Sequence, residues 1–130
     1  MRIDMHAHIV DRDYVEALTR LRGLAAERTA DGKTRIDVRI LSLSTPNVYP
    51  WGGAAQAAMA RQANDALARL CRAHPDRFVG LASLPLADTE AALAELGRAV
   101  GELGMQGVVI GSNVDGMAMN DARMEPVWAR

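Results

Sequence analysis

The chain has 130 residues, of which 49% are hydrophobic and 24% are charged, and its formal net charge is -1. These values predict one globular domain with a real core, and the near-zero charge argues against nucleic acid as a partner. The single cysteine excludes an internal disulfide, and the sequence carries neither a long apolar run nor a signal-peptide pattern, so we expect a cytoplasmic protein that does not enter a membrane.

Residues 1–8 alternate in polarity as a strand does. Asp4, His6 and His8 share one face of this predicted strand, because side chains on a strand repeat every two residues. Two imidazoles spaced in this way can reach the same metal ion, and neutral imidazole is a common ligand of zinc. We therefore expect His6 and His8 to be metal ligands, with Asp4 as a hydrogen-bonding partner behind them rather than a third ligand. The alternative is a solvated strand that carries two histidines by chance.

Beyond residue 10, the spacing of the apolar residues changes repeatedly between helix and strand. Helices are expected at residues 11–27, 54–73, 89–103 and from 121 onward, and further strands at residues 36–43, 78–84 and 106–110. Asp88 is suited to cap the third helix, and Pro75 and Gly104 follow helix ends, where these residue types are common. Helices that alternate with apolar strands indicate a parallel sheet with right-handed crossovers.

Four βα units make up about half of a (β/α)8 barrel, which takes roughly 250 residues. The predicted fold class is therefore α/β, as the N-terminal half of a TIM-type barrel with parallel strands. We expect residues 1–130 to form a single partial domain that is truncated at its C-terminus. A half-barrel exposes open strand edges, so association into a homodimer is a further expectation.

The loop after residues 36–43 leaves its strand at the end where a (β/α) barrel carries its active site. Asn47, Tyr49 and Trp51 lie in this loop, and we predict substrate-binding roles for them. The alternative for the two aromatic residues is ordinary packing on the barrel rim, and for Asn47, as for Asn113, it is turn formation. His74 is not expected to bind metal, because it ends a helix that leads into a strand and so lies at the opposite face of the barrel.

Several runs of residues carry a resemblance to a known family. They are residues 4–8, Asp37-Val38-Arg39-Ile40-Leu41-Ser42, the loop with Tyr49 and Trp51, Asn64-Asp65, Glu95-Leu96, Leu103-Gly104-Met105-Gln106-Gly107-Val108 and, most specifically, His74-Pro75-Asp76-Arg77-Phe78-Val79-Gly80-Leu81 followed by Leu84-Pro85-Leu86. Through these runs the chain resembles the N-terminal half of the metal-dependent decarboxylase branch of the amidohydrolase superfamily.

The resemblance implies a metal site at the mouth of the barrel, with His6 and His8 as two of its ligands and Trp51 on the wall of the substrate pocket. It implies a divalent metal, with zinc as the expected ion, and no organic cofactor. The remaining ligands and the catalytic histidine of the family would lie beyond residue 130. We therefore expect the 130-residue chain alone to be inactive.

The reaction implied by the resemblance is the non-oxidative decarboxylation of a small carboxylated substrate, a carbon–carbon lyase reaction. Metal-dependent hydrolysis of an amide, lactone or ester is an alternative use of the same kind of site. A non-catalytic half-barrel, either a fragment or a subunit that pairs with another chain, is the alternative from a different functional class.

Overall fold

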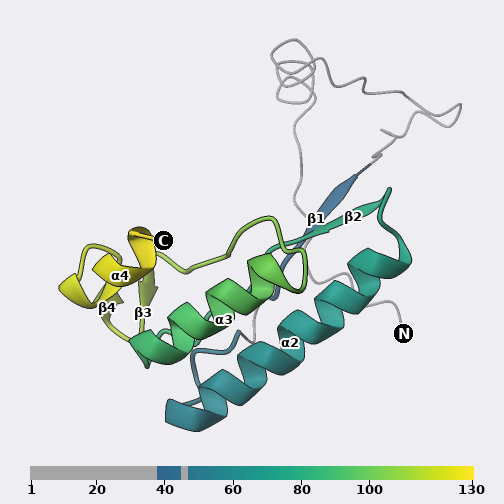
Figure 1. Ribbon diagram of the computed structural model, residues 1–130. Coiled ribbons are helices and arrows are strands. Elements are labelled where there is room, and N and C mark those ends of the chain that lie inside the picture. The colour runs from purple at the N-terminus through teal and green to yellow at the C-terminus, as the bar shows by residue number, and fades with distance from the viewer. Residues whose placement is uncertain (1–37, 45–46) are drawn as a thin grey trace, which may run out of the picture.

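The computed structural model describes residues 38–44 and 47–130, and Figure 1 shows how their elements are arranged. In chain order the elements are β1 (Arg39–Leu41), α2 (Gly53–Ala73), β2 (Phe78–Gly80), α3 (Thr89–Gly101), β3 (Asn113–Val114), β4 (Met117–Ala118), the 3-10 helix η1 (Ala122–Met124) and α4 (Glu125–Trp128). The strand and helix expected at residues 1–8 and 11–27 lie outside the described residues. The described fold is α/β, as predicted.

The parallel arrangement of the strands is confirmed in this part of the chain. β1 and β2 pair in parallel, with Ile40 opposite Val79. A parallel bridge between Ala82 and Val108 continues the pairing into a third segment. The strands are shorter than expected, and residues 106–110 contribute only that bridge.

The two long helices begin and end close to where their local signals predict. α2 is rich in alanine, which favours helix, and it ends at His74, directly before Pro75. The Asp88 side chain accepts a hydrogen bond of 3.1 Å from the backbone N–H of Ala91, so it caps α3 as expected. Within the described part of the chain, no helix is long and apolar enough to cross a membrane.

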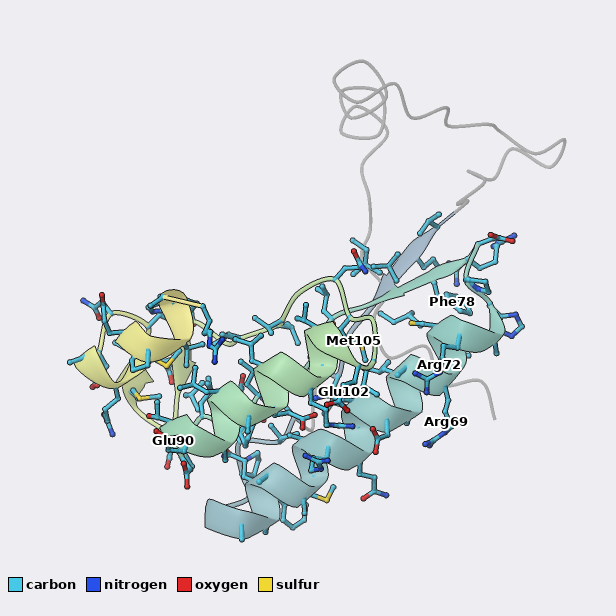
Figure 2. The ribbon with its side chains drawn as sticks, in the orientation of Figure 1. Arg69, Arg72, Phe78, Glu90, Glu102 and Met105 are labelled. Carbon is cyan, nitrogen blue, oxygen red and sulfur yellow. The ribbon has the colours of Figure 1, made fainter. Side chains whose placement is uncertain are left out.

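α2 and α3 lie side by side, and α2 also packs against β2 (Figure 1). The buried face of α2 repeats every four residues and consists of Gln56, Ala60, Asn64 and Ala68. The alanines in this stripe let the neighbouring backbones approach closely. Arg69 and Arg72 lie on the exposed side of the same helix (Figure 2).

A buried network of polar side chains joins α2, the segment after β2 and α3. The Asn64 amide donates to the backbone oxygen of Ser83 at 2.9 Å and to Glu95 at 2.8 Å, and its oxygen accepts from the Ser83 N–H at 2.9 Å. Glu95 is 2% exposed and accepts two hydrogen bonds, of 2.9 and 2.7 Å, from Arg98. Arg98 also contacts Asp65 on α2 at 2.7 Å. Because a buried carboxylate is costly unless it is paired, this network fixes how the two helices sit on the strands.

The chain beyond residue 110 differs from the expectation. Residues 113–118, for which the sequence analysis expects neither a strand nor a helix, form the antiparallel hairpin of β3 and β4. Asp115 and Gly116 have φ values of 50° and 76°, which suit the two-residue turn of a tight hairpin. The helix expected from residue 121 is a 3-10 turn followed by the four residues of α4.

Candidate functional site

The loops that follow the strand ends meet at one end of the parallel sheet. Because β1, β2 and residues 106–110 run in the same direction, residues 47–52, 84–88 and 111–117 all leave the sheet at that end. A cavity of about 340 Å³ lies among these loops. Its lining consists of Tyr49, Pro50, Trp51, Gly52, Gln56, Leu86, Ala87, Thr89, Val114, Asp115, Met117 and Arg123.

A second hollow of about 300 Å³ lies next to the first and shares part of its wall. Asn47 and Asn113 line it together with Tyr49, Pro50, Val114 and Asp115. The three residues predicted for this loop from the sequence, Asn47, Tyr49 and Trp51, are therefore brought together around two adjoining cavities. Their substrate-binding roles stay predictions.

Asn47 shapes the loop on which the two aromatic residues lie. Its side-chain oxygen accepts a hydrogen bond of 2.9 Å from the backbone N–H of Tyr49, two residues further along the chain. This is the local turn that asparagine commonly makes. The turn-forming role considered for Asn47 is thus present in the structure.

Tyr49 is half-buried, and its ring packs on the core formed by the hairpin and α3. Burial raises the pKa of the Tyr49 phenol, and a hydrogen bond with the Gly111 backbone lowers it by a smaller amount. The phenol is consequently neutral around pH 7. Gly111 itself has little room for a side chain, because a Cβ there would lie 3.0 Å from the backbone oxygen of Asn113.

Trp51 presents an exposed aromatic surface at the cavity, since 48% of the residue is accessible. Its backbone is held on both sides. The Trp51 N–H donates to the Val48 oxygen at 3.3 Å, and the Trp51 oxygen accepts a hydrogen bond of 2.9 Å from the side chain of Gln56.

Gln56 is a buried polar lining residue that the sequence analysis did not single out, and Asp115 and Arg123 are two charged ones. Gln56 belongs to the first turn of α2 and is 2% exposed. A polar residue in a helical stripe that otherwise consists largely of alanine was the available signal, because burying an amide requires partners for its hydrogen-bonding groups.

The charged groups at the cavity are Asp115, in the hairpin turn, and Arg123, in η1. The Arg123 guanidinium contacts both carboxylate oxygens of Asp121 at 2.8 Å and is largely exposed. These hydrogen bonds hold the pKa of Asp121 well below its usual range. Arg123 therefore lines the cavity in an exposed ion pair with Asp121.

The predicted metal ligands cannot be compared with this geometry. Asp4, His6 and His8 lie outside the described residues. Across residues 38–44 and 47–130, no group of three histidine, cysteine, aspartate or glutamate side chains could hold a metal ion. His74 follows the last residue of α2, and its ring packs edge-on against that of Phe78, with ring centroids 5.7 Å apart. Because Phe78 begins β2, His74 lies at the end of the sheet opposite the cavities.

Comparison with known proteins identifies the class to which the chain belongs. Residues 3–130 match the model of the amidohydrolase family. The chain belongs to this family, and the resemblance noted in the sequence to its decarboxylase branch is confirmed by the relatives.

Among the curated relatives, a 2-amino-3-carboxymuconate-6-semialdehyde decarboxylase from Dictyostelium discoideum is 37% identical over 95 residues, which cover 72% of this chain and 26% of the relative. A gamma-resorcylate decarboxylase from Rhodococcus jostii (strain RHA1) is 41% identical over 104 residues, which cover 72% of this chain and 32% of the relative. The chain thus spans about a third or less of the length of these relatives.

The structure is similar to a solved 5-carboxyvanillate decarboxylase from Novosphingobium aromaticivorans, with a TM-score of 0.69 and 34% sequence identity. The match covers 72% of this chain and 27% of the neighbour. That neighbour was solved with bound manganese and 3-methoxy-4-hydroxy-5-nitrobenzoic acid. A divalent metal and a small carboxylated aromatic ligand therefore occur within the group of structures that this fold resembles.

Proposed function

We propose that this chain forms part of a metal-dependent enzyme that removes carbon dioxide non-oxidatively from a small aromatic carboxylate. The observation that carries the proposal is the similarity, over most of the described chain, to decarboxylases of the aromatic acids gamma-resorcylate and 5-carboxyvanillate. The similar decarboxylase of the open-chain 2-amino-3-carboxymuconate-6-semialdehyde supports the reaction type alone. These relatives favour decarboxylation over hydrolysis as the use of the site.

The cavity at the strand ends supports a substrate with one ring. Its volume of about 340 Å³ is in the range of small-molecule sites. Trp51 and Tyr49 offer aromatic surface on which a ring can stack, and Leu86, Val114 and Met117 add apolar wall. The Arg123 guanidinium at the rim suits a carboxylate or phenolate oxygen.

We propose His6 and His8 as two of the metal ligands and Asp4 as the group that orients them. A divalent cation, when bound, supplies the positive charge that holds a substrate carboxylate and lowers the pKa of a water. Paired imidazoles suit zinc, and the manganese in the related 5-carboxyvanillate decarboxylase makes that ion the main competitor. The catalytic histidine is proposed to lie beyond residue 130.

The described residues are proposed to be the first part of a (β/α)8 barrel, with residues 1–8 as the strand beside β1. This arrangement would place His6 and His8 at the same sheet end as the loop of Asn47, Tyr49 and Trp51. The lone cysteine supports a location in the cytoplasm.

The proposal is tested on the complete reading frame that contains this sequence, and the protein is loaded in turn with zinc and with manganese. Release of carbon dioxide from gamma-resorcylate or 5-carboxyvanillate is the expected result. The variant His6→Ala/His8→Ala should lose bound metal and turnover together, whereas His74→Ala, at the other end of the sheet, should keep both. A metal-loaded protein that releases no carbon dioxide from any aromatic carboxylate would overturn the proposal.

A further inference from the structure

Gln56, at the start of α2, makes three side-chain hydrogen bonds, and all of them join it to backbone groups of loops. Its side-chain nitrogen donates to the backbone oxygens of Trp51 at 2.9 Å and Tyr49 at 3.4 Å. Its side-chain oxygen accepts from the backbone N–H of Ala87 at 2.8 Å. The residue is 2% exposed, so water does not compete for these groups. One buried amide thus joins two loops that are far apart in the sequence.

Both of those loops contribute to the cavity wall. Tyr49 and Trp51 come from the loop after β1, and Leu86 and Ala87 come from the loop after β2. Two other hydrogen bonds of the first loop, from Tyr49 N–H to Asn47 and from Trp51 N–H to Val48, stay within that loop. They fix its local shape but do not attach it to the second loop.

We propose that Gln56 is a positioning residue, which sets the shape of the substrate cavity by holding the Tyr49–Trp51 backbone against the Ala87 wall. The inference rests on the proposed function, because a fixed wall matters only if the cavity binds substrate. Gln56 is not proposed to contact the ligand itself, because its amide hydrogens are donated to the backbone oxygens of Tyr49 and Trp51. The aromatic side chains of these two residues would make the contacts with the ligand.

Two substitutions separate the donor and acceptor roles of the amide. Gln56→Met has a similar volume and removes all three hydrogen bonds. Gln56→Glu keeps an oxygen that can accept from Ala87, but a carboxyl group can donate at most one hydrogen bond and donates none when ionised. Gln62→Met is the matched control, because Gln62 lies on the exposed face of the same helix.

The readouts are the accessibility of Trp51 and the hydrogen exchange of the Ala87 amide, both measured without substrate. Trp51 is one of two tryptophans, so a Trp128→Phe background leaves it as the sole tryptophan reporter. In Gln56→Met we expect acrylamide to quench Trp51 up to about twofold more strongly and the Ala87 amide to exchange about tenfold faster, in line with the loss of a buried hydrogen bond. Gln56→Glu should expose Trp51 while Ala87 stays protected, and Gln62→Met should change neither.

In the complete reading frame, Gln56→Met should raise KM for gamma-resorcylate about tenfold and change kcat about threefold or less, because it disturbs the wall and not the reacting groups. If the unsubstituted protein of the complete reading frame has no activity, the proposed function fails. The Trp51 and Ala87 measurements still decide the role of Gln56 in that case.

Unchanged Trp51 quenching in both Gln56 variants would overturn the inference. If far-ultraviolet circular dichroism finds Gln56→Met unfolded, the unsubstituted chain still provides a test. Its Ala87 amide must exchange much more slowly than a solvent-exposed amide, and rapid exchange there would overturn the inference equally.

Discussion

At the scale of single residues, the protonation of Tyr49 gives a prediction with a definite sign. Burial raises the pKa of this phenol above its ordinary value of 10.0. Since the pKa is higher in the folded chain than in the unfolded chain, the stabilisation is fully present below the unfolded pKa and is lost as the pH rises through the folded pKa. We expect the free energy of unfolding to fall in this alkaline window, measured by urea denaturation at a series of pH values.

The variant Tyr49→Phe is the control for this assignment, because it keeps the ring and removes the ionising group. It should lose the alkaline decline that Tyr49 causes. Absorbance of the phenolate, taken as the difference between the unsubstituted chain and Tyr49→Phe, should likewise place the pKa of Tyr49 above its ordinary value. Ionisation of Tyr49 at or below its ordinary pKa would contradict the burial of its phenol.

At the scale of elements, the amide of Asn64 is the link between α2 and α3. Replacing it in the variant Asn64→Asp puts a second carboxylate beside the buried Glu95 and removes the donor to Ser83. The expected loss is about 3–5 kcal/mol in the free energy of unfolding, as for other broken buried ion networks. Urea denaturation at pH 7 measures it directly.

The matched variant Gln62→Glu adds the same charge to the exposed face of α2 and should change the free energy of unfolding by no more than about 0.5 kcal/mol. A loss below about 1 kcal/mol in Asn64→Asp would mean that the network does not hold the helices together.

The elements that could be predicted from the sequence are those with signals inside the element. α2 and α3 carry a long helical pattern, and Asp88 and Pro75 mark where the helices start or stop. The hairpin of β3 and β4 escaped prediction because each strand has two residues, too few for alternation to be visible. Gln56 escaped because its burial depends on where residues 49–51 and Ala87 fold, which the helical pattern alone does not contain.

At the scale of the whole molecule, the site draws on segments that are distant along the chain. The loops with Trp51 and Ala87 meet because three segments run in parallel, and a parallel fold could be predicted from alternating helices and strands. The side chains that line the cavity could not be predicted from the sequence, because their positions depend on how far each loop extends. His6 and His8 are proposed as ligands from the motif alone, and they stay a prediction.

The edge of the parallel sheet leads to a last prediction, about self-association. Residues 1–8 are proposed to cover the edge of β1, which leaves the edge at residues 106–110. Within the described part of the chain these residues join the sheet only through the parallel bridge between Ala82 and Val108. An unpaired strand edge favours pairing with another chain. We expect the purified 130-residue chain to form a homodimer through this edge, and Val109→Lys to raise its dissociation constant at least about tenfold in sedimentation experiments, because a charged residue beside an open edge disfavours strand pairing. Val100→Lys, which changes an apolar residue that is 49% exposed on α3, is the control and should leave association intact. An unsubstituted chain that stays monomeric at all concentrations would contradict the expected dimer, and equal effects of the two lysines would locate the association surface away from residues 106–110.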